Sequence, residues 1–514
     1  MRLLIVDVDS LRPDHLGCYG YDRDTSPNVD RIAAAGTRFS NCFVSDSPCL
    51  PSRTALATCR FGVKNGVVAH YGSGQWLRMY DRPGDAGGPP ADRPFTFQHL
   101  SENGVRTATV TSFGKRHAAY HFTSSFRESN QPTPQTGREK ADEVASVATD
   151  WLSRNATADD WLLHVNFWDV HHPYQNIDEH VDEIRSSGSP PSWPDEEALD
   201  DQNGMTGVRC RDLWPTPSDL KRDGHRTGGF EEWPMPERFD DRSAVEALVD
   251  GYDAAIRNVD AAIGRLLETL EEAGVRDETA VVVTGDHGEA LGEHGIYAEH
   301  ALAHPPCQRV PMIVSWPDVT EGSQAVDDYV YQFDLMPTIC ELADVPVPSG
   351  WDGESFAPAL AGDDFDGRET LVCGHGIFMQ SRAVYHDDWL YVRILHPGVF
   401  SYPGMYNAPD APGDGFELLH DLEADPHMTE NLIEERPDVA DDLRSQLDVH
   451  VASWTDSRDA TGLDPLVEMA REDGPFLYVD PEALAESYSA LERMDAQRDR
   501  VERARSAEDA DDRR

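Results

Sequence analysis

The chain has 514 residues and a formal net charge of −50 at pH 7. A chain of this length usually needs more than one hydrophobic core, so we expect a large domain and a smaller second one. The acidic residues are spread along the whole chain, and of the 44 lysines and arginines only four are lysines. A surface of this sign repels phosphate groups, which argues against nucleic acids and anionic membranes as partners.

An acidic surface with few lysines is favoured in concentrated salt, where screening weakens the repulsion between like charges. We therefore expect a protein from a halophile, specifically a halophilic archaeon. The apolar run at 3–6 is too short for a signal peptide, and no run reaches the length that spans a membrane. The eight cysteines include no Cys-x-x-Cys pair and are too sparse for a disulfide framework. The expected location is the cytoplasm.

Apolar periodicity predicts strands and helices in alternation through the first two thirds of the chain. The first strand is expected at 3–8, and a short helix with a glycine stop follows at 28–36. Further elements are strands at 107–111, 161–167 and 280–284 and helices at 144–152 and 244–270. This order predicts an α/β fold, with a mostly parallel central sheet sandwiched by helices. Reactive residues of such sheets collect at the carboxyl ends of the strands.

Changes in composition suggest the domain boundaries. Residues 186–236 are rich in proline, glycine, aspartate and tryptophan and lack periodicity, so we expect an irregular insertion over the pocket of a large domain at 1–365. From 366 to 482 the pattern is shorter and more β-like before it ends in helices, which predicts a smaller C-terminal α+β domain. Residues 483–514 are almost entirely polar and charged, which is typical of a solvated helix or a disordered tail.

One cysteine stands in an unusual setting, because residues 49–53 read Cys-Leu-Pro-Ser-Arg. This segment resembles the signature of the sulfatase family, Cys-x-Pro-Ser-Arg. In that family a separate enzyme oxidises the cysteine to formylglycine, and the hydrated aldehyde attacks the sulfur of a sulfate ester. A geminal diol suits this reaction because one hydroxyl attacks and the other then expels the bound sulfate. The alternative for Cys49 is a small, inert core residue.

Two further segments resemble the metal-binding motifs of the family. Asp9 follows the first strand, where the family places its first carboxylate ligand. Many members carry a second aspartate at the position of Ser10, so this chain departs from the pattern there, and Asp7 on the same strand face is a backup candidate. The segment Thr-Gly-Asp-His-Gly-Glu at 284–289 follows the fourth predicted strand and provides Asp286 and His287.

The resemblance thus implies one divalent metal ion held by Asp9, Cys49, Asp286 and His287. Oxygen ligands suit Ca²⁺ or Mg²⁺, whereas an imidazole shifts the preference toward Mn²⁺ or a similar ion. We expect Ca²⁺ first and Mn²⁺ second, with Mg²⁺ also possible. By the same resemblance, Arg53 would hydrogen-bond the hydrated aldehyde or the carboxylates beside the metal.

Two segments match the parts of the family that bind the substrate. Residues 114–117 read Gly-Lys-Arg-His where the family shows Gly-Lys-x-His, so Lys115 is expected to contact a sulfate oxygen as a compact point charge, with His117 beside it. Residues 171–173 read His-His-Pro and match the His-x-Pro segment. This match assigns His171 to sulfate binding or to protonation of the leaving oxygen, and we interpret His172 as a loop residue.

The chain departs from the family where many members supply a second lysine. Near that position it carries Glu299 and His300, so His300 is the expected general acid, with His304 a weaker candidate. The segments at 416–426 and 430–432 also look like the closing part of the family.

Together, the matches resemble a metal-dependent, arylsulfatase-like enzyme of the alkaline phosphatase superfamily. They imply an alkaline phosphatase-like fold, a small-molecule or saccharide sulfate ester as the substrate, and transient contact with the formylglycine-generating enzyme. Two alternatives stay open. One is a phosphonate or phosphate ester hydrolase on the same scaffold, and the other is a non-catalytic anion-binding protein in which Cys49 stays a thiol.

Overall fold

The computed structural model describes residues 1–78, 92–134, 137–174, 177–204, 236, 239–396, 416–455 and 463–472. The predicted tail at 483–514 lies outside these residues. So does most of the predicted insertion at 186–236, whose described part, up to residue 204, contains the helix α9 (Glu196–Gly204). Among the described helices, none is both long enough and apolar enough to cross a bilayer.

An eight-stranded sheet forms the centre of the molecule, in the order β11-β2-β10-β7-β1-β6-β4-β5. Only β10 runs against its neighbours, and the other pairs of adjacent strands are parallel. The predicted mostly parallel sheet is therefore confirmed. Its strands are β1 (Arg2–Val8), β2 (Thr37–Phe43), β4 (Arg106–Val110), β5 (Glu128–Asn130), β6 (Trp161–Phe167), β7 (Ala280–Gly285), β10 (Met312–Ser315) and β11 (Gln324–Tyr331).

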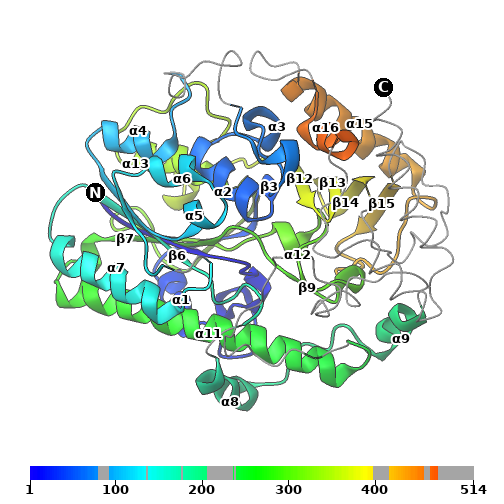
Figure 1. Cartoon of the computed structure of the whole chain (residues 1–514), viewed down its shortest axis with the longest axis horizontal. Coiled ribbons are helices and arrows are strands. Elements are labelled where there is room, and N and C mark those ends of the chain that lie inside the picture. Colours follow the sequence, from blue (N-terminus) through cyan, green and yellow to red (C-terminus); the bar gives the residue numbers. More distant parts are fainter. Residues whose placement is uncertain are drawn as a thin grey trace.

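Both faces of the central sheet are buried, as the apolar run of β1 requires. Leu3 and Ile5 point into one hydrophobic cluster, while Leu4, Val6 and Val8 point into the other, because side chains alternate along a strand. Figure 1 shows the helices that cover each face. One layer contains α1 (Pro27–Ala34), α7 (Ala141–Asn155) and α11 (Arg242–Glu272), and the other contains α2 (Cys49–Thr58), α4 (Thr96–Glu102), α5 (Phe113–Arg116), α6 (Tyr120–Ser124) and α13 (Leu335–Leu342).

The predicted helices at 28–36, 144–152 and 244–270 correspond to α1, α7 and α11. The longest, α11, begins where the side chain of Asp241 accepts a hydrogen bond from the backbone N–H of Ala244, a common helix N-cap. Shorter helices fill the connections, namely α3 (Gly62–Asn65), α8 (Asp178–Ser187), α12 (Pro305–Gln308) and α14 (Ala357–Leu360), with the two-stranded ribbon β8 (Ala290–Leu291) and β9 (Tyr297–Glu299).

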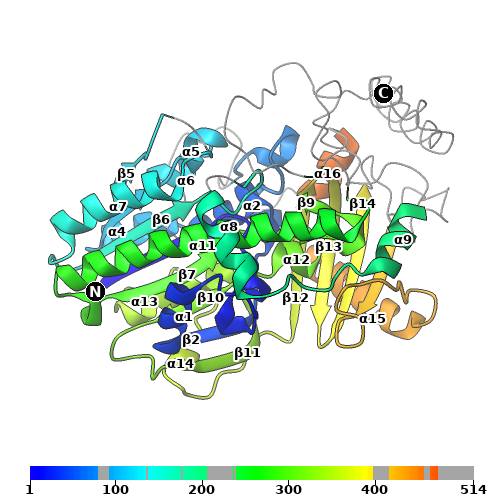
Figure 2. The same cartoon turned by 90° about the horizontal axis from the view of Figure 1, so that it is seen from below.

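A second sheet stands beyond the carboxyl ends of the central strands, as Figures 1 and 2 both show. It contains β12 (Thr370–Ile377), β13 (Met379–His386), β14 (Trp389–His396) and β15 (Phe416–Asp421), and α15 (Pro437–Thr455) and α16 (Pro465–Glu472) pack on it. The predicted boundary near 365 falls between α14 and β12. The edge strand β3 (Asp46–Ser47) pairs with Gly374 and His375 of β12, so the second sheet is joined to the residues just before Cys49.

Candidate active site

Polar residues follow the carboxyl ends of three neighbouring strands of the central sheet, and we call this side of the sheet its carboxyl edge. Asp9 follows β1 directly, Asp286 follows β7, and the loop after β6 carries His171. The order β7-β1-β6 puts these ends side by side, and the first residue of α2, Cys49, lies at the same edge. The carboxyl edge of a parallel sheet is where this class of fold places its reactive groups.

The structure brings the four predicted metal ligands together. Asp9, Cys49, Asp286 and His287 are all buried, and one potential ligand atom from each lies within 4.8 Å of the others. Nε2 of His287 is 3.1 Å from Sγ of Cys49 and 3.7 Å from carboxylate oxygens of Asp9 and of Asp286. We call these four residues the metal cluster.

Arg53 holds the carboxylates in place. It lies one helical turn after Cys49 on α2, is fully buried, and donates from Nη1 to Asp9 Oδ2 at 2.9 Å and from Nε to Asp7 Oδ2 at 2.9 Å. The same Nη1 atom forms an ion pair with Asp286 at 2.6 Å. Arg53 thus lies on the carboxylate side of the cluster, where it was expected.

The backup candidate Asp7 has a different role from the metal ligands. Its carboxylate lies between Arg53 and the Nε2 atom of His164, 3.1 Å away, and it is not one of the four residues of the metal cluster. Ser10 instead supports two of the ligands. Its backbone N–H donates to Asp286 Oδ1 at 3.2 Å, and its hydroxyl lies 3.3 Å from Asp9 Oδ1.

Lys115, which is expected to contact a sulfate oxygen, is exposed, and its Nζ atom donates to the carbonyl oxygen of Pro134 at 3.1 Å. It lies on the one-turn helix α5, on which successive side chains point in different directions. Its contact with the substrate stays a prediction. His117, directly after this helix, packs its ring 4.7 Å from that of His70 and 6.4 Å from the parallel ring of Trp168.

The predicted acid–base histidines lie beside the cluster. The ring centre of His300 is 4.4 Å from that of His287 and 5.6 Å from that of His171. Burial, and then the neighbouring His172, lower the pKa of His171 to about 3, so this imidazole is neutral near pH 7. The weaker candidate, His304, instead places Nε2 3.0 Å from the Sγ atom of Cys307.

His172 is more than the loop residue that the sequence suggested. Its Nδ1 atom lies 3.1 Å from Glu289 Oε1, and its Nε2 atom lies 3.8 Å from Glu299 Oε1. Both carboxylates are buried, and burial raises their pKa values well above the ordinary range. Glu289 is the last residue of the Asp-His-Gly-Glu motif, so its position was visible in the sequence, although its contact with His172 was not.

Two other histidines near the cluster were not predicted. The backbone N–H of Leu50 donates to Nε2 of His70 at 3.1 Å, which fixes the residue next to Cys49. His375 of β12 places Nδ1 2.9 Å from Ser47 Oγ. Neither residue belongs to a recognisable motif, and His375 comes from the second sheet, so only the tertiary structure shows that they support this segment.

Residues 2–345 match the family model described as Sulfatase. The chain belongs to the sulfatase family. It is 23% identical to an N-acetylglucosamine-6-O-sulfatase of Bacteroides thetaiotaomicron over 84% of this chain and 82% of that protein, and 24% identical to human arylsulfatase A over 92% and 93%. A phosphonate monoester hydrolase of Agrobacterium radiobacter has a similar fold, with a TM-score of 0.62, 17% identity and coverage of 88% of this chain and 96% of that one.

The sulfatase family implies a divalent metal ion and a formylglycine, and the residues of the cluster fit the ion. Three buried carboxylates, Asp7, Asp9 and Asp286, face the single guanidinium of Arg53. Burial raises the pKa of Asp286, and the charges of Asp9 and Asp7 add to this effect, so its pKa lies well above the usual value despite Arg53. A bound divalent cation would offset the excess negative charge.

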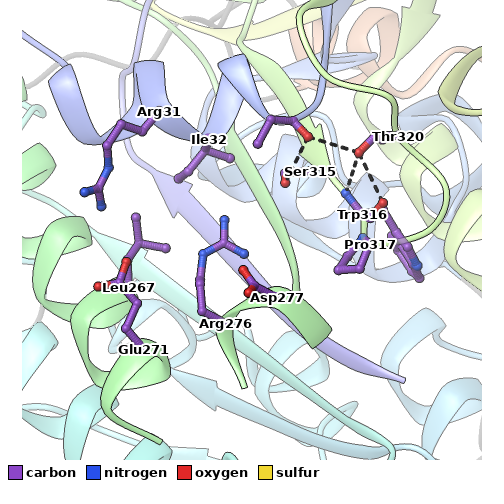
Figure 3. Close-up of a pocket in the computed structure, with 11 residues that line it drawn as sticks. Arg31, Ile32, Leu267, Glu271, Arg276, Asp277, Ser315, Trp316, Pro317 and Thr320 are labelled. Carbon is purple, nitrogen blue, oxygen red and sulfur yellow. Dashed lines mark hydrogen bonds between the residues drawn. The ribbon is translucent and has the colours of Figure 1, made fainter. Parts of the chain in front are cut away.

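A cavity of about 420 Å³ lies elsewhere on the sulfatase and does not reach the cluster. Figure 3 shows that its walls come from α1, the end of α11, the turn before β7 and the segment after β10. Arg31 and Arg276 line it together with Glu271 and Asp277. Residues just before β7 line this cavity, whereas Asp286 follows β7. The cavity and the metal cluster therefore lie at opposite ends of this strand.

Proposed function

We propose that the protein hydrolyses a sulfate ester with a formylglycine formed from Cys49 as the nucleophile. The observation that carries this proposal is the position of Cys49 Sγ, 3.1 Å from His287 Nε2 within a buried cluster of two carboxylates and one imidazole. In the unmodified chain, Sγ marks where the oxygens of the hydrated aldehyde would lie. The hydrated aldehyde supplies one hydroxyl that attacks sulfur and a second whose deprotonation expels sulfate.

The chain's own residues prepare this reaction. Arg53 fixes the carboxylates of Asp9 and Asp286 through contacts of 2.9 and 2.6 Å, which keeps the ligand atoms in place before a substrate arrives. For His171 or His300, beside the cluster, to give a proton to the leaving oxygen, the negative charge of the bound sulfate ester must raise the lowered pKa of that imidazole. A divalent ion held by Asp9, Asp286, His287 and residue 49 would supply positive charge for the sulfate oxygens.

We propose Ca²⁺ as this ion, with Mn²⁺ as the second candidate because one ligand is an imidazole. As substrate we propose a sulfate ester of a small molecule or a saccharide. The two relatives, an N-acetylglucosamine-6-O-sulfatase and an arylsulfatase, support this class. A formylglycine-generating enzyme is the partner that the modification requires.

A second candidate function is hydrolysis of a phosphonate or phosphate ester. Its support is the fold shared with the phosphonate monoester hydrolase, together with the buried Glu299 near the place where many sulfatases carry a lysine. Sulfuryl and phosphoryl groups both present tetrahedral oxygens, so one scaffold can bind either group.

We further propose that the protein works in concentrated salt in the cytoplasm of a halophilic archaeon. The net charge of −50 and the small number of lysines support this proposal.

The decisive experiment is mass spectrometry of the peptide that contains Cys49, from protein made in a salt-adapted archaeal host. Conversion of the thiol to an aldehyde lowers the peptide mass by about 18 Da. Purified enzyme is then assayed on aryl and saccharide sulfates and on a phosphonate monoester, with Cys49→Ala as the inactive control. An unmodified thiol would contradict the formylglycine mechanism, and a preference for the phosphonate would favour the second function.

A further inference from the structure

The cavity in Figure 3 is lined by side chains of both charges. Arg31 of α1 and Arg276 of the turn before β7 are its cations, and Glu271 of α11 and Asp277 of the same turn are its anions. Its volume of about 420 Å³ lies within the range of sites that bind small molecules, roughly 300–1,000 Å³. The cavity thus presents two positive and two negative groups to one space of ligand size.

These four charges do not neutralise one another. Within the part of the chain that the structure describes, none of them forms an ion pair, and Arg276 donates only to the carbonyl oxygen of Thr279, at 3.2 Å from Nη1. Other arginines of α11 do pair with acids, since Arg257 contacts Asp260 at 3.3 Å and Arg265 contacts Asp142 at 2.5 Å. The charged groups at the cavity are therefore available to a ligand.

The charges are nevertheless close enough to act on each other. Burial lowers the pKa of the half-buried Arg276, the charges of Asp277 and Glu271 oppose this effect, and the charge of Arg31 adds to it. The two guanidiniums therefore repel each other across the cavity, and a carboxylate placed between them would offset that repulsion. A planar guanidinium can hold both oxygens of such a carboxylate.

An apolar surface lies between the charged groups. Ile32 and Leu267 are buried, and Figure 3 shows them among the charged side chains. Leu267 precedes Glu271 by one turn of α11, so the two residues lie on the same helix face. Trp316, with 8% of its surface exposed, lines the cavity on the side of the segment after β10. An apolar group of a ligand would contact this surface.

Hydrogen bonds fix one wall of the cavity. The hydroxyl groups of Ser315 and Thr320 donate to the carbonyl oxygen of Ala35, at 3.4 and 3.2 Å, and join the end of α1 to the segment after β10. The backbone N–H of Trp316 donates to Thr320 Oγ1 at 3.0 Å. The dashed lines of Figure 3 mark these contacts. A wall that is already in place lowers the entropic cost of binding.

We propose that this cavity binds a small zwitterion, namely an α-amino acid with an apolar side chain. Its carboxylate faces the two arginines, its ammonium group faces the two acids, and its side chain packs on Ile32 and Leu267. A simple anion would meet two carboxylates in the cavity, and a simple cation would meet two guanidiniums, whereas a zwitterion satisfies both pairs. The site goes beyond the hydrolysis of a sulfate ester, because it lies at the other end of β7 from the metal cluster.

Calorimetry with matched ligands tests the charge requirement. Leucine, methionine and phenylalanine are titrated into the wild-type protein at a constant, high KCl concentration. N-acetylleucine lacks the ammonium group, and leucinamide lacks the carboxylate. A charged hydrogen-bonded contact contributes enough that its loss weakens binding roughly tenfold or more. We therefore expect at least one of the three amino acids to bind, and both analogues to bind at least about tenfold more weakly than leucine does.

Two variants locate the binding site. Arg276→Ala should weaken leucine binding at least about tenfold, whereas Arg265→Ala, which removes an arginine of α11 outside the cavity, should not change it. Ala35→Phe keeps all four charges but fills the cavity, so it should also prevent binding. The thermal unfolding midpoint of each variant shows whether its fold is intact. Hydrolysis of 4-nitrophenyl sulfate should be the same in Arg276→Ala as in the wild type.

Three results would overturn the proposed site. The first is that none of the three amino acids binds. The second is that N-acetylleucine or leucinamide binds as tightly as leucine, which would show that one charge is sufficient. The third is that folded Arg276→Ala and Ala35→Phe bind leucine as the wild type does, which would place the ligand elsewhere.

Discussion

The Sγ atom of Cys49 lies 3.1 Å from the Nε2 atom of His287, although 238 residues separate them in the sequence. The contact forms because α2 begins at the edge of the sheet where β7 ends. The proposed nucleophile and a metal ligand therefore share one buried site, and a change at either residue should affect the other.

Removal of the metal ion should abolish hydrolysis. After dialysis against a chelator, activity should return on addition of Ca²⁺ or Mn²⁺, and the unfolding temperature should rise with it, because the ion binds only the folded site. Asp286→Asn removes one charge from the cluster and should leave clearly less than one bound ion per chain by elemental analysis. Full metal content and activity in this variant would contradict the assignment of Asp286.

Replacement of Arg53 should destabilise the protein strongly. Arg53→Ala leaves the buried carboxylates of Asp7, Asp9 and Asp286 without their shared partner, and removal of one member of a buried ion pair costs about 3–5 kcal/mol. Urea unfolding of the metal-free protein measures this loss. Arg154→Ala breaks an exposed pair with Asp150 and serves as the control, which should change stability little. Similar losses for both variants would show that the carboxylates do not need Arg53.

Asp169 should make stability depend on pH. Burial raises its pKa from 3.8 to about 7, so the folded state binds this proton more tightly than the unfolded state. Stability is then unaffected by Asp169 below about pH 4, falls as the pH rises to about 7, and stays lower above it. Asp169→Asn should remove this fall and raise stability at pH 8 by up to about 4 kcal/mol, since one pKa unit corresponds to about 1.4 kcal/mol.

The comparison of Asp169→Asn with the wild type by urea unfolding at pH 5 and pH 8 tests this prediction. The side-chain oxygen that accepts from Ala141 N–H and Asn258 is retained in asparagine. An equal difference in stability at the two pH values would show that Asp169 is ionised in the folded protein.

Gly288 should be required for the position of His287. A Cβ atom at Gly288 would lie 2.1 Å from the backbone oxygen of Pro306, and the Gly288 carbonyl faces His287 Nδ1 at 2.8 Å. Gly288→Ala should therefore reduce metal content and activity together. Gly188 is the control, because its Cβ atom would come no closer than 3.3 Å to the flexible side chain of Arg23 and 3.9 Å to the backbone oxygen of Asp22. If Gly288→Ala keeps both properties, the loop after β7 can shift without moving the ligand.

Salt should stabilise the protein. With a net charge of −50, self-repulsion is strong at low ionic strength, and the Debye length shortens from about 10 Å at 0.1 M salt to about 3 Å at 1 M. The unfolding temperature should rise by tens of degrees between about 0.1 M and several molar KCl. An unfolding temperature that is independent of KCl would contradict adaptation to salt.

Local patterns in the sequence were sufficient for the framework of the fold. The apolar runs of β1, β6 and β7 and the period of α11 are visible without tertiary contacts, because burial on both faces needs continuous apolar strands. Parallel strands end at one edge, so Asp9, Asp286 and His171 could be placed together before the structure was known.

Finer details stayed open where side-chain direction depends on distant partners. Asp7 shares a strand face with Asp9, yet Arg53 and His164 hold it outside the metal cluster. His172 looked like a loop residue, but Glu289 lies 3.1 Å away. Neither contact follows from spacing along the chain.

The sequence by itself determined the α/β framework, the motif around Cys49 and the set of residues at the sheet edge, because these depend on local periodicity and short spacings. Only the tertiary structure decided which partners surround the two cationic side chains of α5. On the single turn of α5, Lys115 and Arg116 point in different directions, and Trp168, Gly137 and the Pro134 carbonyl determine where each one lies. Those partners lie 19 or more residues away in sequence, so their effect arises only when the chain has folded.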